Sequence, residues 1–197
     1  MSLAGTSTPI VTPDARGAVV QACLLGWAGL ELLLWMRNRG GKTAPDLTFA
    51  LVVASVAAGI NLAFRAAHEP GTATGGGLAV TAIGLTAVVL GVALRTWAIL
   101  ALGRFFKFVV VIQDGHHVVD SGPYRFVRHP SYSGGLLALI GVGLALGSWL
   151  STLAAVGVPL LAILIRIAVE EARLARDLGD DYRSYARRTK RLVPGLW

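Results

Sequence analysis

The chain is poor in charged residues and almost free of cysteine. Aspartate, glutamate, lysine and arginine make up only 15% of its 197 residues, whereas soluble domains carry about 25% charge. Because 54% of the residues are hydrophobic, this shortage of charge favours an integral membrane protein. The single cysteine, Cys23, excludes an internal disulfide framework and a cysteine-rich metal site.

The amino terminus lacks a basic stretch before its apolar run, so we expect no cleaved signal peptide. The formal net charge is nevertheless +7. In a membrane protein, excess lysine and arginine are typical of cytoplasmic loops beside anionic lipid. We therefore expect membrane lipids, and not nucleic acid, as partners of the basic residues.

Long apolar segments divide the chain, and about 20 apolar residues suffice to cross a bilayer as a helix. Three such segments lie at 18–36, 47–64 and 78–102. Two more, at 132–147 and 152–169, flank a short uncharged turn. The sequence thus predicts an all-α integral membrane protein with about five transmembrane helices, the last two forming a helical hairpin.

We expect a single domain over residues 1–197. In this interpretation residues 1–102 form three transmembrane helices, and residues 103–197 form a connector, the hairpin and a C-terminal tail. Lysine and arginine gather in the first connection, the third connection and the tail. Because such residues favour the cytoplasmic side, five crossings place the N-terminus outside and the C-terminus in the cytoplasm.

The two arms of the hairpin are nearly equal in length, which brings together polar segments that are distant in sequence. The segment 128–132 precedes the hairpin, and Glu170 and Glu171 follow it, so both should lie at one membrane face. A basic and aromatic cluster facing two carboxylates suits a zwitterionic ligand. The hairpin base is therefore the candidate binding site.

Ionisable residues in or near the spans are costly in lipid and are functional candidates by default. Arg95 and Arg166 could hold the anionic head of a substrate, or could extend to the nearby cytoplasmic face and reach water. Glu31 is better explained by a structural pairing. These alternatives stay open at the level of sequence.

The histidines of the chain do not form the ligand pattern of a metal site. His116 and His117 are adjacent, so their side chains point apart, and no cysteine or acidic pattern completes a ligand set with His129. We therefore expect no metal, and assign His117 to the loop beside the candidate binding site.

The second half of the chain resembles the isoprenylcysteine carboxyl methyltransferase family and related phospholipid methyltransferases. The resemblance lies in SGPYRFVRHPSYSG at 121–134, the Glu170–Glu171 pair, and LGDDYRSY at 178–185 followed by a basic residue before a proline. These families consist of small multi-span membrane enzymes that use S-adenosylmethionine (SAM). The resemblance implies SAM as cofactor, S-adenosylhomocysteine (SAH) as product, and a cytosolic cofactor pocket built from the connector and the tail.

The resemblance also implies which residues form that pocket. They are His117, Val118, Val119, Gly122, Tyr124, His129, Pro130, Tyr132, Glu170 and Glu171. Glu170 or Glu171 would accept hydrogen bonds from the ribose and the ammonium group, and which of the two does so stays open. Arg128 or Tyr124 would donate to the cofactor carboxylate.

The leading hypothesis is a SAM-dependent methyltransferase acting on a lipophilic carboxylate, by resemblance a prenylcysteine-type substrate. A carboxylate is already ionised at pH 7, so catalysis needs positioning and desolvation rather than a base. We assign Arg95, Arg166 and Glu170 to the catalytic group. The alternatives are a phospholipid or amine N-methyltransferase and a non-catalytic membrane accessory protein.

Overall fold

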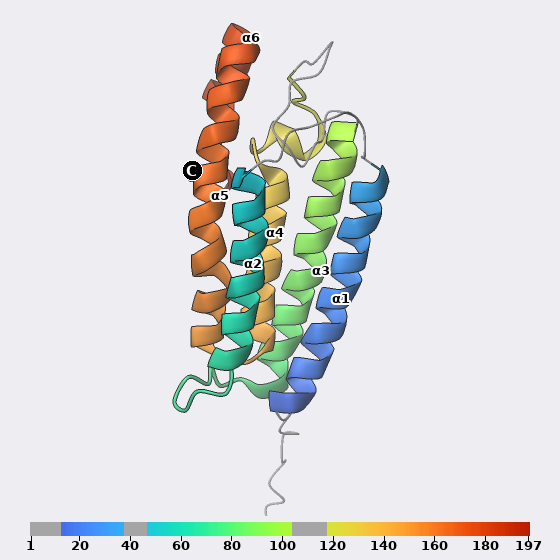
Figure 1. The fold of residues 1–197 in the computed structure, drawn as a ribbon, viewed down its shortest axis with the longest axis vertical. Helices are drawn as coiled ribbons and strands as arrows, with labels where there is room; N and C mark the ends of the chain where they lie inside the picture. The colour runs from blue at the N-terminus through green and yellow to red at the C-terminus, as the bar shows by residue number, and fades with distance from the viewer. Residues whose placement is uncertain (1–12, 38–46, 104–117) are drawn as a thin grey trace, which may run out of the picture.

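The structure, a computed structural model, describes residues 13–37, 47–103 and 118–197 (Figure 1). Its long helices run side by side along the long axis of the molecule (Figure 1). In chain order the described elements are α1 (Pro13–Arg37), α2 (Leu47–Ala66), α3 (Gly77–Leu102), the short 3-10 helix η2 (Gly122–Arg125), α4 (Pro130–Ala145), α5 (Trp149–Asp177) and α6 (Gly179–Arg188).

Four of these helices, α1, α2, α3 and α5, are long and apolar enough to cross a membrane. The predicted all-α membrane fold is confirmed. Helix α4 has 16 residues and rises about 24 Å, which is less than the roughly 30 Å hydrocarbon core of a bilayer. The predicted number of five spans therefore stays a prediction.

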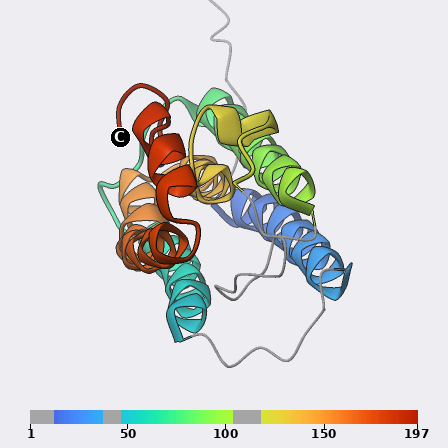
Figure 2. The ribbon, with the colours of Figure 1, turned by 90° about the horizontal axis from the view of Figure 1, so that it is seen from above.

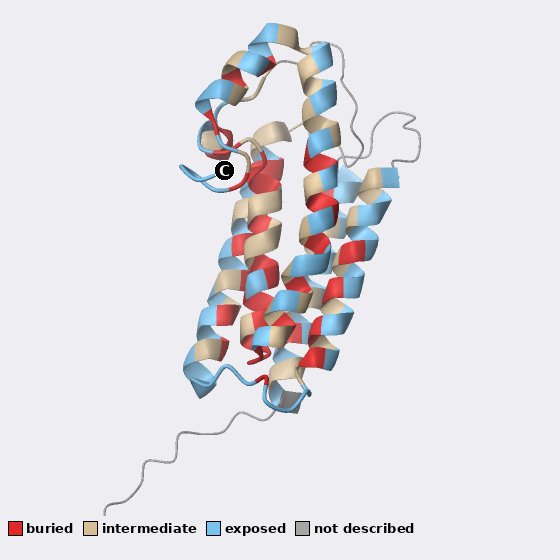
Figure 3. Ribbon diagram, turned by 90° about the vertical axis from the view of Figure 1, so that its left-hand side faces the viewer, coloured by how far each residue is buried: buried red, intermediate tan, exposed pale blue. Residues whose placement is uncertain are grey.

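Exposed residues lie along the outward faces of the helices (Figure 3), and many of them are large and apolar. Leu25 on α1 is 70% exposed and Leu161 on α5 is 67% exposed. Exposed apolar surface of this extent is unfavourable in water and is typical of a surface that faces lipid or a partner. The exposure pattern agrees with a bundle embedded in a membrane.

Helix α4 lies inside the bundle, packed against α3 on one side and α5 on the other (Figure 2). Small residues allow the close approach of α3 and α4. A Cβ added at Gly91 would press on the backbone nitrogen of Ala138 and lie 2.6 Å from the Gly134 carbonyl oxygen. Only glycine fits there, as expected where membrane helices pack through dispersion forces.

The start of α5 differs from the turn predicted at 148–151. Ser148 is the N-cap of α5, and its hydroxyl accepts a hydrogen bond from the Ser151 N–H at 3.2 Å. The Ser148 hydroxyl also donates to the Thr72 hydroxyl at 3.0 Å. Because buried hydroxyls need partners in apolar surroundings, these bonds fix the loop after α2 against α5.

The end of α5 also differs from prediction. The helix continues to Asp177, beyond the predicted end at residue 169, because its glutamate, alanine, arginine and leucine residues are strong helix formers. Glu170 and Glu171 consequently lie within α5 and not after it. Gly179, with a φ of +56°, allows the chain to reverse into α6, which runs back toward the connector (Figure 3).

Candidate functional site

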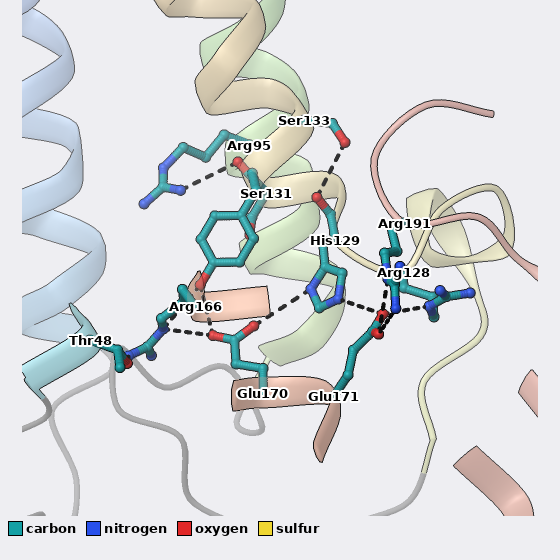
Figure 4. A network of polar contacts seen from close by, with 11 residues as sticks. Thr48, Arg95, Arg128, His129, Ser131, Ser133, Arg166, Glu170, Glu171 and Arg191 are labelled. Atoms are coloured by element: carbon teal, nitrogen blue, oxygen red, sulfur yellow. Dashed lines mark hydrogen bonds and ion pairs between the residues drawn. The ribbon is translucent and has the colours of Figure 1, made fainter. Parts of the chain in front are cut away.

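The start of α4 and the C-terminal part of α5 meet through polar contacts (Figure 4). The Tyr132 hydroxyl donates to Glu170 Oε1 at 2.7 Å, and Arg128 Nε donates to Glu171 Oε1 at 2.8 Å. The two polar segments that the hairpin was predicted to bring together are therefore in contact. Their side chains form one connected polar cluster.

Local backbone chemistry places these side chains. His129 is the N-cap of α4 and Pro130 occupies its first turn, where a proline costs no helical hydrogen bond. The Tyr132 N–H donates to the His129 carbonyl at 3.0 Å, so both aromatic side chains leave the same helix start. Glu170 and Glu171 are adjacent on α5 and project in different directions, which gives them different partners.

Glu170 lies at the buried end of the cluster. Arg166, four residues earlier on α5, donates from Nε to Glu170 Oε1 at 2.9 Å and to the Tyr132 hydroxyl at 3.2 Å. The Arg166 side chain is 2% exposed, so it does not extend to water as the snorkelling alternative required. Its Nη1 donates to the Thr48 hydroxyl at 2.7 Å (Figure 4).

Glu171 lies at the end of the cluster that faces the C-terminal tail. It accepts from Arg128 and from Arg191, whose Nε lies 3.0 Å from Glu171 Oε2. Arg128 Nη1 also donates to the carbonyl oxygens of Ala186 and Thr189. Arg128 thus holds the tail in this structure, and its predicted role as donor to a cofactor carboxylate stays a prediction.

His129 lies between the two carboxylates (Figure 4). Its Nδ1 is 3.5 Å from Glu170 Oε2, and its Nε2 is 3.3 Å from Glu171 Oε1. Burial disfavours the charged ring, but the hydrogen bonds and charges of Glu170 and Glu171 outweigh burial and raise the pKa of His129 above its ordinary value of 6.5. Only the imidazolium form can donate from both nitrogens at once.

We expect the stability of the protein to depend on pH through His129. Because its pKa is raised on folding, its stabilising contribution is complete below pH 6.5 and is lost as pH rises through the raised value. Thermal unfolding in detergent over this pH range should show a falling midpoint that flattens in His129→Gln. The exposed His68 supplies the control: an equal flattening in His68→Gln would contradict the assignment.

The tail after α6 is bound to the connector by its backbone. The Arg128 N–H donates to the Lys190 carbonyl at 2.7 Å, and the His129 N–H donates to the Arg191 carbonyl at 3.0 Å. The Ser133 hydroxyl donates to the Leu192 carbonyl at 2.6 Å. This docking brings Arg191 to Glu171, a contact that sequence reasoning missed because backbone pairing leaves no residue signature.

Arg95 belongs to a separate contact. Its Nε and Nη2 pair with the two carboxylate oxygens of Glu31, the latter at 3.0 Å, and its Nη1 donates to the Ser131 carbonyl at 3.3 Å. The Trp27 indole donates to the same carboxylate at 3.0 Å. The structural pairing predicted for Glu31 is confirmed.

The remaining predicted pocket residues lie around this cluster. Tyr124 and Pro130 are buried, and Val118, Val119 and Gly122 are half-buried. The Tyr124 carbonyl accepts a 2.7 Å hydrogen bond from the Tyr185 hydroxyl, which ties η2 to α6. Their contact with a cofactor stays a prediction, and His117 lies outside the described residues.

Comparison with known proteins matches the motif-bearing half of the chain. Residues 82–176 match the model of the isoprenylcysteine carboxyl methyltransferase (ICMT) family. A probable protein-S-isoprenylcysteine O-methyltransferase of Oryza sativa subsp. indica is 35% identical over 117 residues, which cover 58% of this chain and 61% of the rice protein. Protein-S-isoprenylcysteine O-methyltransferase B of Arabidopsis thaliana is 36% identical, with 58% and 59% covered.

A solved structure of a eukaryotic intramembrane Ras methyltransferase, ICMT, shares the fold. It superposes with a TM-score of 0.70 at 21% identity, covering 95% of this chain and 70% of the other. The aligned region spans about three fifths of the length of the curated plant relatives. Residues 82–176 are therefore similar to the isoprenylcysteine carboxyl methyltransferase family, the family that the motifs resemble.

Proposed function

We propose that the protein is a SAM-dependent membrane methyltransferase that methylates a lipophilic carboxylate of the prenylcysteine type. One observation carries the proposal: the family-matched segment folds so that His129 and Tyr132 meet Glu170 and Glu171. A compact site with carboxylates, aromatic rings and guanidinium groups suits a ligand that carries both charges. The prenylcysteine class rests on the printed names of the relatives.

The residues present fit SAM, which supplies an activated methyl group when bound. Glu170 and Glu171 offer carboxylate oxygens to an ammonium group and to ribose hydroxyls. The rings of His129 and Tyr132 are stacked, with centroids 5.8 Å apart, and offer an aromatic wall. The buried Tyr182 hydroxyl has no hydrogen-bond partner among the described residues, so it is available as a donor.

The protein's own contribution is to orient and desolvate an acceptor that is already ionised. A carboxylate needs no general base at pH 7, which agrees with a site in which Glu170 is already bound by Arg166 and Tyr132. Positioning accounts for the expected rate gain. The arginines of the tail favour a cytoplasmic face for this end of the bundle, and hence an N-terminus outside.

Methyl transfer by the purified protein in detergent tests the proposal. Labelled SAM is incubated with N-acetyl-S-farnesylcysteine, with phosphatidylethanolamine, or with neither. We expect label in a base-labile ester of the prenylcysteine alone. Label in phosphatidylethanolamine would instead support N-methylation. The absence of transfer together with the absence of SAH binding would support an accessory protein.

A further inference from the structure

Residues 193–197, which we call the apolar turn, close on themselves through backbone hydrogen bonds. The N–H groups of Leu196 and Trp197 donate to the Val193 carbonyl at 3.2 and 3.3 Å, and the Val193 N–H donates to the Trp197 carbonyl at 3.0 Å. Between them lie Pro194, which has no N–H, and Gly195, with a φ of +76°, a pair typical of a type II turn. Backbone groups that are bonded inside a segment need no water, which is the condition for lying in an apolar layer.

The side chains of the apolar turn face outward. Leu196 is 77% exposed, Val193 is 48% exposed and Trp197 is 44% exposed, and Pro194 between them is exposed as well. Apart from the glycine, every residue of the turn is therefore both apolar and exposed. A contiguous apolar surface of this kind is unfavourable in water and indicates contact with lipid or protein.

The residue before the apolar turn fixes its position against the bundle. Leu192 is buried and shares one apolar core with Ile163 and Ile167 of α5, against which Leu136 of α4 packs. The Leu192 carbonyl also accepts a 2.6 Å hydrogen bond from the Ser133 hydroxyl, in the first turn of α4. The turn is therefore attached to the side of the bundle, beside apolar residues of α4 and α5.

The apolar turn lies at the height where the apolar spans begin. Ile165, between Ile163 and Ile167 in α5, is 51% exposed, so the outer surface of α5 is apolar at this level. The chain end, marked C, lies beside α5, below α6 and level with the upper end of α2 (Figure 1). Helix α2 is a candidate membrane span that begins there, at Leu47. Because the end of a span marks the membrane boundary, the apolar turn lies at that boundary.

Two cations adjoin the apolar turn. Lys190 is exposed, and Arg191 Cζ lies 5.1 Å from the centroid of the Trp197 ring. Tryptophan is enriched at the headgroup level of a bilayer, where basic side chains are attracted to anionic lipid. A lipid boundary thus accounts for the apolar, aromatic and basic side chains together, and for their continuity with the apolar surface of α5.

We infer that the apolar turn is a membrane anchor, which inserts Val193, Leu196 and Trp197 between the headgroups and the acyl chains at this end of the bundle. Arg191 joins the anchor to the polar cluster, because it contacts the Trp197 ring and donates to Glu171. The inference is independent of the proposed function, since it needs neither a ligand nor a reaction.

Spin labelling in vesicles tests the anchor. Cys23→Ser removes the one cysteine of the chain, and a nitroxide is attached at Leu196→Cys. In vesicles of phosphatidylcholine and phosphatidylglycerol, collisions of the label with oxygen, which concentrates in the bilayer, are compared with collisions with a water-soluble nickel chelate. Leu161→Cys on α5, 67% exposed, supplies the lipid reference, and Arg183→Cys on α6, 60% exposed, the aqueous one. We expect the oxygen-to-nickel ratio at Leu196 to lie closer to the lipid reference.

A second label tests whether the apolar side chains cause the insertion. With the nitroxide at Val193→Cys, Leu196→Asp should lower the oxygen-to-nickel ratio toward the aqueous reference. The insertion equilibrium should shift by about tenfold or more, as expected when the transfer free energy of a leucine side chain is lost. Leu196→Ile keeps an apolar side chain of the same size and should keep the ratio.

Equal nickel collision rates for labels at Leu196 and Arg183 would overturn the inference. A Leu196 label that neither reagent reaches would also overturn it, because protein would then cover the turn. An unchanged ratio at Val193 in Leu196→Asp would do so as well. The proposed function fails separately: an anchored chain that transfers no methyl group would keep the anchor and lose the reaction.

Discussion

Replacing Glu170 by alanine is expected to damage both stability and the proposed activity. Arg166 is 2% exposed and loses its carboxylate partner, and the Tyr132 hydroxyl loses its acceptor. Removing one member of a buried ion pair leaves an uncompensated charge and costs about 3 kcal/mol or more. If the loss falls on the ligand-bound state, it amounts to about a hundredfold or more in kcat/KM.

Thermal unfolding in detergent measures the loss of stability in Glu170→Ala, and calorimetric titration with SAH together with the rate of methyl transfer measures the loss of ligand binding and activity. Asp180 supplies the matched control, because it also pairs with an arginine, Arg183 at 3.0 Å, but at the surface. Exposed pairs contribute little, so Asp180→Ala should resemble the wild type in both measurements. Wild-type unfolding and SAH binding in Glu170→Ala would contradict a central role for this carboxylate.

The Gly91→Ala variant should strongly destabilise the contact between α3 and α4. The added Cβ meets backbone atoms of Ala138 and Gly134, and backbone cannot move aside as a flexible side chain can. Overpacking of this kind costs about 3 kcal/mol. We expect a lower thermal midpoint, and weaker SAH binding because α4 begins at the site residues.

Gly26 of α1 provides the control for this variant. A Cβ at Gly26 meets nothing within 4 Å among the described residues, while alanine improves helix propensity by about 1 kcal/mol. Gly26→Ala should therefore unfold at the wild-type temperature or slightly above. If Gly91→Ala and Gly26→Ala had equal midpoints, close α3–α4 packing would not contribute measurably to stability.

Much of the fold could be predicted from the sequence because the apolar segments are long and their boundaries are polar. The meeting of Tyr132 with Glu170 followed from two arms of similar length. Helix α5 extends beyond its predicted end, because the fall in hydropathy at Glu170 does not coincide with the end of the helix. Hydropathy reports the membrane boundary, whereas helix propensity and packing decide where the helix ends.

The site was predicted only where side chains carry recognisable chemistry. Thr48 was missed because a threonine near a helix start normally bonds to its own backbone, and nothing in its neighbourhood indicates a distant arginine. The motif contains only a basic residue before a proline, and the contact of Arg191 with Glu171 depends on the backbone pairing of residues 190 and 191 with the connector. Such pairing has no side-chain pattern to detect.

Helix α5 combines an apolar span with both site carboxylates in one continuous element, and it rises beyond the other helices (Figure 3). Thicker or thinner bilayers change the tilt of long transmembrane helices. A change in the tilt of α5 would carry Glu170 and Glu171 with it relative to His129. We therefore expect the affinity of the protein for its ligand to depend on the length of the surrounding lipid chains.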